Sequence, residues 1–215
     1  MGAIFRREVR SYFTSPIGYI FLAAFYAYSG VMFANYSLES GYTRLDSVFS
    51  ALLIIIIVLI PVLTMRTISA PVGLGSIVVG KFLAAFLIYI IAIAITGVFA
   101  VIVSAFGTPD WNVVVGNIVA LALVGGAYIA IGIFCSSFTE NQIVAAVISF
   151  IALIFVSFLS TIGNLLPFEW LTTVCEKVSF GERYYSFTYG LFDFSNVVFF
   201  LSAIVAFLFL TVRVL

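Results

Sequence analysis

The sequence predicts an all-α integral membrane protein with six transmembrane helices, and three observations carry the prediction. Its 215 residues are 64% hydrophobic and 8% charged, whereas globular proteins carry about 25% charged residues. The mean hydropathy of the chain is +1.29. Long apolar runs recur in the sequence. The clearest covers residues 52–65 and is followed by Arg66. Because about 20 apolar residues cross a bilayer, we expect these runs to be the spans of a single transmembrane domain.

Residues 2–14 precede the first span and are expected to form an interfacial helix that lies flat on the membrane. On a helical wheel, the apolar residues occupy one half, while Arg6, Arg7 and Arg10 occupy the other and face anionic headgroups. A solvated basic tail is the alternative. The Ser-Pro pair at 15–16 then breaks the helix and turns the chain into the membrane.

The six spans follow in order, at about residues 17–34, 48–65, 78–106, 113–134, 143–162 and 195–212. Cytoplasmic loops of membrane proteins carry an excess of Lys and Arg, and Arg66 marks the cytoplasmic end of the second span. With this orientation most basic residues lie inside and most acidic residues lie outside. The sequence therefore predicts a multi-pass protein of the cytoplasmic (inner or plasma) membrane with both termini in the cytoplasm.

The segment 163–194 between the last two spans is too long for a simple connector and too aromatic for a solvated one. Its apolar residues recur with helical spacing among polar ones, which indicates one or two short amphipathic helices that dip into the outer leaflet. We expect Pro167 to begin the first helix and Gly181 to separate the two. An ordinary surface loop is the alternative.

Residues 75–81 match the G-x4-G-K pattern of a phosphate-binding loop, but Phe82 replaces the Ser or Thr that would hold Mg²⁺. The motif also lies at the start of a membrane span, where no strand precedes it. We therefore reject a nucleotide site and expect Lys81 to snorkel toward the membrane surface.

Catalytic chemistry is not indicated anywhere in the sequence. The chain has no histidine, which removes the commonest general base and metal ligand. We find no carboxylate pair or metal cluster, so no catalytic residue, metal site or cofactor is expected in this chain. The net charge of zero gives no sign of nucleic-acid binding.

Polarity within the spans is mild, and no charged residue lies near the middle of any span. Ion-coupled transporters usually place ionisable groups there, so coupling to an ion gradient is not expected. The polar residues near the fifth span either line a path or join helices, and we favour packing; they are Ser149, Ser157, Ser160, Thr161 and Asn164. Small residues at spacing four, Ala122, Gly126 and Ala130, predict a close helix contact within or between subunits.

Five stretches in the same order together resemble a known family. They are FRREVRSYFTSPIGYIF, LIPVLTMR, GKFLAAFLIY, SSFTENQIVAA and YGLFDFSNVVFFLSAI, which begin at residues 5, 59, 80, 136 and 189. The chain resembles ABC-2-type transporter permeases, and within them the branch of gliding-motility and nitrous-oxide-reductase-maturation permeases. The resemblance covers nearly the whole chain.

The resemblance implies a membrane subunit that pairs with a second permease copy, or a related permease, on two cytoplasmic ABC ATPase subunits. ATP and Mg would be bound by those partners. It also implies that the 2–14 helix is the family's elbow helix and that 163–194 is a re-entrant region capping the path. We expect coupling to the ATPase through the cytoplasmic face, at Arg66, Glu140, Asn141, Arg6, Arg7 and Arg10. Glu140 has an alternative role, since an acid near a helix N-terminus stabilises it.

One departure from the family lies after Arg66. The family has an acidic, charged stretch there, whereas here Ser69 passes directly to Ala70. Either this protein couples differently or a charged loop is missing between these two residues. We favour the missing loop because both flanks match the family.

The expected function is therefore the permease subunit of an ABC exporter, which is not itself an enzyme. A non-transporting membrane scaffold or immunity protein that binds a partner is the alternative. A lipid-modifying enzyme is weaker, because the spans lack the usual acid, base and metal groups.

Overall fold

The computed structural model describes residues 2–38, 45–65, 74–107, 110–164, 169–188 and 193–214. Every regular element among them is a helix, which confirms the predicted all-α class. The α-helices are α1 (Gly2–Thr14), α2 (Pro16–Phe33), α3 (Asp46–Thr64), α4 (Leu74–Ser104), α5 (Trp111–Ser136), α6 (Gln142–Ser157), α7 (Leu159–Asn164), α8 (Glu169–Val178), α9 (Phe180–Thr188) and α10 (Phe194–Val214). A π-helical turn, η1 (Ala34–Leu38), follows α2.

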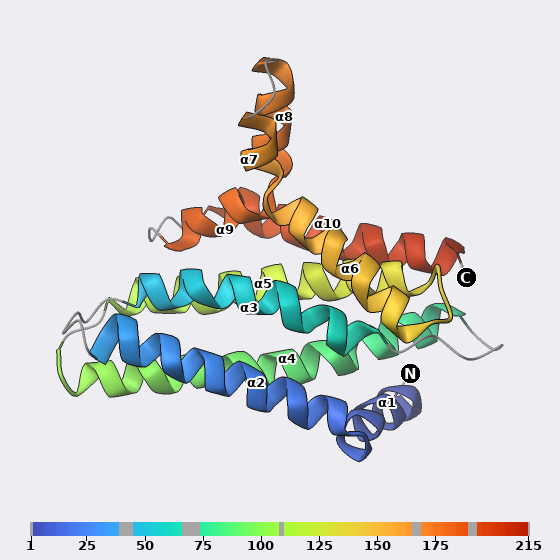
Figure 1. Cartoon of the computed structure of the whole chain (residues 1–215), viewed down its shortest axis with the longest axis horizontal. Helices are drawn as coiled ribbons and strands as arrows, with labels where there is room; N and C mark the ends of the chain where they lie inside the picture. Colours follow the sequence, from blue (N-terminus) through green and yellow to red (C-terminus); the bar gives the residue numbers. More distant parts are fainter. Residues whose placement is uncertain are drawn as a thin grey trace.

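Among the described residues, five helices are long and apolar enough to cross a membrane: α2 with its π-helical turn, α3, α4, α5 and α10. They run alongside one another as the body of the molecule, which we call the bundle (Figure 1). Five of the predicted spans fall on these helices, and α4 extends a turn beyond its predicted start at residue 78. The predicted span at 143–162 differs, because α6 has only 16 residues and ends at Ser157.

The core of the bundle is built around α5, which packs against α3, α4, α6, α9 and α10. Glycines let these neighbours approach closely. A Cβ atom at Gly125 would overlap the Tyr89 ring of α4, and one at Gly132 would overlap the Thr64 side chain of α3. At Gly126 a Cβ would lie 3.1 Å from Ile204 of α10. The contact predicted at Gly126 is therefore made within the subunit.

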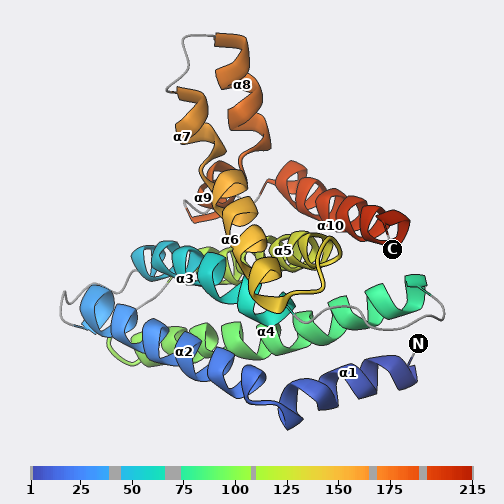
Figure 2. The same cartoon turned by 45° about the vertical axis from the view of Figure 1, so that its right-hand side comes forward.

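The first helix, α1, lies across the end of the bundle at which both chain termini are found (Figures 1 and 2). Its apolar side packs against α2 and α4. The Tyr12 side chain is buried, and its hydroxyl donates a hydrogen bond to the Leu63 carbonyl oxygen at 2.9 Å. That carbonyl belongs to the last turn of α3, where carbonyls lack helical donors. The helix is thus fixed to the end of α3, with Arg6, Arg7 and Arg10 exposed.

At the other side of the molecule, α7 and α8 form a hairpin that stands out sideways from the bundle, between its two ends (Figures 1 and 2). The predicted short helices of 163–194 are present as α8 and α9, but Ser179 separates them and Gly181 lies inside α9. The prediction that Gly181 separates two helices was wrong. This glycine lies within α9, where the helix backbone packs closely against Ser157. Pro167 lies outside the described residues.

Candidate functional site

Helix α6, which begins at Gln142, ends well before it would reach the far end of the bundle. The 16 residues of α6 extend about 24 Å at 1.5 Å per residue, which is less than the roughly 30 Å hydrocarbon layer. The hydroxyls of Ser157 and Tyr128 lie 2.6 Å apart. Tyr128 is about 25 Å along α5 from Trp111 and about 12 Å from Ser136 at that rise. The interruption therefore lies inside the bundle, at a depth between its two ends.

Ser157 lies at the interruption and bonds to the preceding turn of its own helix. Its hydroxyl donates to the Leu153 carbonyl oxygen at 2.6 Å, a bond to the preceding turn that commonly bends helices. Tyr128 is consequently the donor in its contact with Ser157. Phe158 then leaves helical geometry, with φ −102° and ψ 18°, and α7 begins at Leu159.

The start of α9 packs directly against this interruption. A Cβ atom at Gly181 would lie only 2.6 Å from the Ser157 carbonyl oxygen, so only glycine fits there without a shift. The Ser179 hydroxyl lies 3.4 Å from both the Ser157 carbonyl oxygen and the Ser160 hydroxyl. Ser160 in turn donates to the Glu182 carboxylate at 3.1 Å. These contacts join the end of α6, the start of α7 and the start of α9 into one polar cluster.

A second set of contacts fixes α9 in the bundle. Arg183 donates from Nε to the Lys177 carbonyl oxygen at 2.7 Å and from a terminal nitrogen to Asn196 Oδ1 at 2.8 Å. Its guanidinium lies 4.0 Å from the centre of the Phe199 ring, a cation–π contact. The hydroxyl of the next residue, Tyr184, donates to the Phe49 carbonyl oxygen at 2.9 Å. Since Phe49 is in the first turn of α3, α9 runs from the interruption toward the end of the bundle opposite α1.

The residues predicted to line a path divide into two groups. Ser149, Ser157 and Ser160 are buried, and each donates a hydrogen bond within the protein, Ser149 to the Gly132 carbonyl oxygen at 3.4 Å. Ser149 and Ser160 thus bond to other helices, and Ser157 also contacts the Tyr128 hydroxyl of α5. Thr161 and Asn164 are exposed on α7.

Exposed polar side chains thus occur beside the bundle rather than beyond its end. Glu176 and Lys177 are exposed in the last turn of α8, immediately before Ser179 of the polar cluster. In hydrocarbon a charged side chain costs about 2.5–3.5 kcal/mol on the insertion scale. Interrupted backbone at membrane depth is tolerated only where it is buried in protein or lines a water-filled cavity. If the bundle spans a bilayer, this side of the hairpin must therefore face water or protein.

The residues predicted to couple to a partner lie mostly at the end of the bundle that carries α1. Asn141 is the N-cap of α6, and its Oδ1 accepts from the backbone nitrogens of Ile143 at 2.9 Å and Val144 at 3.4 Å. Glu140 is exposed beside it. Arg66, and with it the predicted loop between Ser69 and Ala70, lies outside the described residues.

The charged residues of α1 and α4 lie in different surroundings. Arg7 pairs with Glu8 at 3.3 Å on the exposed side of α1. Lys81 was predicted to snorkel to the membrane surface, but its exposed fraction is only 4%, so the prediction was wrong. The cause is α1, which covers the start of α4: a Cβ at Gly80 would lie 2.9 Å from Ile4.

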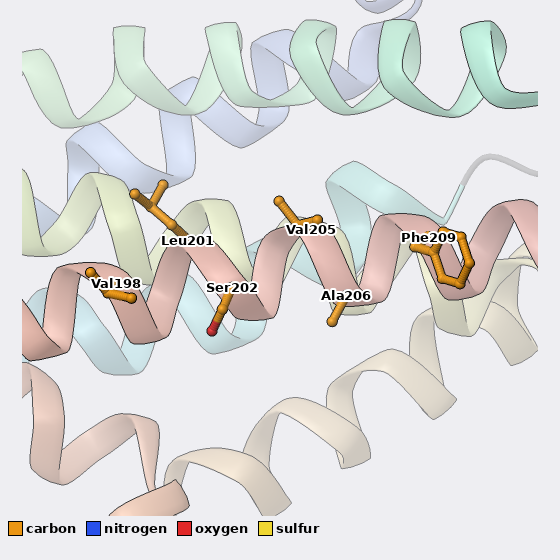
Figure 3. Close-up of a pocket in the computed structure, with 6 residues that line it drawn as sticks. All are labelled: Val198, Leu201, Ser202, Val205, Ala206 and Phe209. Atoms are coloured by element: carbon orange, nitrogen blue, oxygen red, sulfur yellow. The ribbon is translucent and has the colours of Figure 1, made fainter.

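A shallow groove of about 560 Å³ follows one face of α10 (Figure 3). Its lining is almost entirely apolar and consists of Val198, Leu201, Ser202, Val205, Ala206 and Phe209. In Figure 3 these side chains fan out around one helix instead of converging on a point. The groove is therefore an uncovered helix surface rather than a pocket with chemistry. Within the described ranges, no three His, Cys, Asp or Glu residues gather to hold a metal ion.

Comparison with protein-family models finds no match for this chain, and comparison with curated proteins finds none either. The resemblance to ABC-2-type permeases therefore rests on the five sequence stretches. The interruption between α6 and α7 adds features that the sequence patterns did not indicate, namely the partners Tyr128, Ser179, Glu182 and Arg183. Polar residues clustered near one end of an apolar run were the available signal.

Proposed function

We propose that the chain is the membrane-spanning permease subunit of an ABC exporter, driven by ATP hydrolysis in separate cytoplasmic ATPase subunits. The chain itself has no catalytic role in this proposal, and ATP and Mg are bound by the partners. A second permease, either another copy or a related chain, completes the transporter in the cytoplasmic membrane. The permease resemblance of the five sequence stretches is the starting point.

The observation that carries the proposal is the interrupted helix at the end of α6. A transport path needs polar groups at membrane depth, and the exposed Thr161 and Asn164 follow directly on the interruption. In the proposed topology α6 and α9 together make the fifth of six crossings, and the α7–α8 hairpin leaves sideways between them. The central turns of the five long helices carry no charged residue. Energy from a partner ATPase fits this arrangement better than coupling to ions moving through the chain.

Coupling in this proposal runs through the end of the bundle that carries α1. Arg6, Arg7 and Arg10 are exposed there, and the same helix is joined to α3 through the Tyr12–Leu63 hydrogen bond. A partner that moved α1 would thus act on the ends of α3 and α4 together. Glu140 lies next to the N-cap of α6, so a contact at Glu140 would act on the interrupted helix.

The test is a mild-detergent pull-down of the tagged full-length protein from its native membrane, followed by identification of the soluble partners and an ATPase assay. The proposal predicts recovery of a P-loop ATPase whose hydrolysis is lost when its phosphate-binding Lys is replaced. A Val98→Cys variant, altered on the exposed face of α4, serves as a control that should recover the same partner. Recovery of no ATPase would contradict the proposal and favour a scaffold or immunity protein.

A further inference from the structure

Among the five long helices of the described residues, α10 is the least covered. Only 11% of the residues in its most apolar stretch are buried, compared with 28–72% in the other four. The groove along one face of α10 has an almost entirely apolar lining (Figure 3). Among the lining residues only Ser202 is polar, and its hydroxyl donates to the Phe199 carbonyl oxygen of the same helix at 2.7 Å. The lining therefore favours an apolar occupant.

A positive charge lies at one end of this face. Arg213 follows Phe209 by four residues, so the two side chains lie on the same side of the helix. The Arg213 guanidinium lies 5.3 Å from the centre of the Phe209 ring, a cation–π contact that holds it at the end of the groove. Arg213 is exposed, and within the described part of the chain its guanidinium has no hydrogen-bond or ion-pair partner. Its N–H donors are therefore available to an anion.

The dimensions of α10 match those of a membrane lipid. Its 21 residues extend about 32 Å, close to the roughly 30 Å hydrocarbon layer, so Arg213 in the last turn lies at the level of the headgroups. The hydrocarbon of one leaflet is about 15 Å deep, and Ser202 is about 17 Å along the helix from Arg213. An acyl chain that begins at Arg213 would therefore lie against Phe209, Ala206 and Val205 and end near Ser202.

The charges on α10 favour an anionic headgroup. A guanidinium binds phosphate through paired N–H donors. The 21 residues of α10 include no Asp or Glu, so this helix offers no carboxylate to the ammonium of a zwitterionic headgroup. Arg213 also lies at the end of the bundle that carries α1 (Figure 1), which is cytoplasmic in the proposed topology. Anionic lipids give the cytoplasmic leaflet its negative surface potential.

We propose that the α10 groove and Arg213 form a binding site for one anionic phospholipid, with its phosphate on the Arg213 guanidinium and an acyl chain in the groove. The lipid would cover the face of α10 that no described helix covers. The inference goes beyond the proposed function, because it requires α10 to span a bilayer but requires no ATPase partner.

The headgroup contact is tested by native mass spectrometry of the delipidated full-length protein in mild detergent, titrated with dioleoyl phosphatidylglycerol. The wild type should bind one molecule of this anionic lipid several-fold more tightly than it binds the zwitterionic dioleoyl phosphatidylcholine. Arg213→Gln should weaken binding of the anionic lipid about tenfold, because charge-assisted hydrogen bonds contribute on this scale. Lys177→Gln is the matched control, since it removes one exposed positive charge from α8, and it should bind like the wild type.

The acyl-chain contact is tested by filling the groove. Ala206→Trp places a large side chain there and should weaken binding of phosphatidylglycerol several-fold, whereas Val98→Trp, at an exposed residue of α4, should not. Inorganic phosphate added in excess should not displace the lipid, because it cannot fill the groove. Since Arg213 is exposed near the end of its helix, Arg213→Gln keeps the site testable if Ala206→Trp fails to accumulate.

Four results would overturn the inference. The first three are an Arg213→Gln variant that binds phosphatidylglycerol as tightly as the wild type, equal wild-type affinity for the two lipids, and an Ala206→Trp variant with unchanged lipid binding. The fourth is a wild-type dimer that Ala206→Trp converts to monomers, because a protein would then occupy the groove.

Discussion

Replacing Gly181 by alanine probes the interrupted helix directly. The new methyl group would lie 2.6 Å from the Ser157 carbonyl oxygen, well inside van der Waals contact, and the obstacle is backbone that no side-chain rotation relieves. Overpacking of this kind costs about 1–3 kcal/mol. Alanine is favoured over glycine in a helix by about 0.8–1 kcal/mol, which offsets part of the cost. The net expectation for Gly181→Ala is a loss of about 0–2 kcal/mol of stability.

Gly116→Ala is the matched control, because Gly116 lies in α5 and a Cβ there meets nothing within 4 Å. Only the propensity gain applies, so the control should be as stable as the wild type or up to about 1 kcal/mol more stable. The two variants should therefore differ by about 1–3 kcal/mol. The assay is thermal or denaturant unfolding of the purified protein in mild detergent. Equal stability of the two variants would refute the close approach of α9 to Ser157, and with it the geometry of the interruption.

Other substitutions test the surrounding contacts. Tyr184→Phe removes the hydrogen bond to the Phe49 carbonyl oxygen and should lower the free energy of unfolding by about 0.6 kcal/mol, the average for such bonds in membranes. Tyr185→Phe is the control, because its side chain is exposed, and it should leave the unfolding midpoint unchanged. Equal midpoints of the two variants would count against the α9–α3 contact. Asn141→Ala removes the N-cap of α6 and should lower stability by about 1 kcal/mol in the same assay, so an unchanged midpoint would argue against the cap. Glu140→Arg should reduce stimulation of the partner ATPase without preventing membrane insertion, and normal stimulation would defeat its coupling role.

The long helices and α1 could be predicted from the sequence because their signals are local. Apolar runs of sufficient length predicted five of the spans within a few residues. The spacing of Arg6, Arg7 and Arg10 predicted which side of α1 is exposed. The glycine at 126 predicted a close helix contact, although not its partner Ile204.

The interruption of α6 could not be predicted, because its causes are distant in the sequence. The apolar run continues past Ser157 without a proline or glycine, so periodicity extends the helix to Ile162. The contacts that mark the end come from Tyr128 and Gly181, which lie on other helices. Gly181 was interpreted as a separator because a glycine that breaks a helix and one that admits a neighbour look alike in sequence.

The burial of Lys81 could not be predicted from the sequence either. A lysine near the start of an apolar helix indicates snorkelling when lipid surrounds the helix. Here α1 packs over that start, as Ile4 beside Gly80 shows, and the lysine is buried. Tertiary packing of the amphipathic helix α1 on α4 thus reversed an expectation that was sound for an isolated span.

Native mass spectrometry of the complex released from its own membrane tests the central claim most directly, because it weighs the permease together with its partners. The account predicts an assembly that contains this chain, a second permease (another copy or a related chain) and two copies of a P-loop ATPase, and that keeps this composition when ATP is added with Mg. A particle of this chain alone, or bound to a protein without an ATPase, would contradict the assignment as the permease subunit of an ABC exporter.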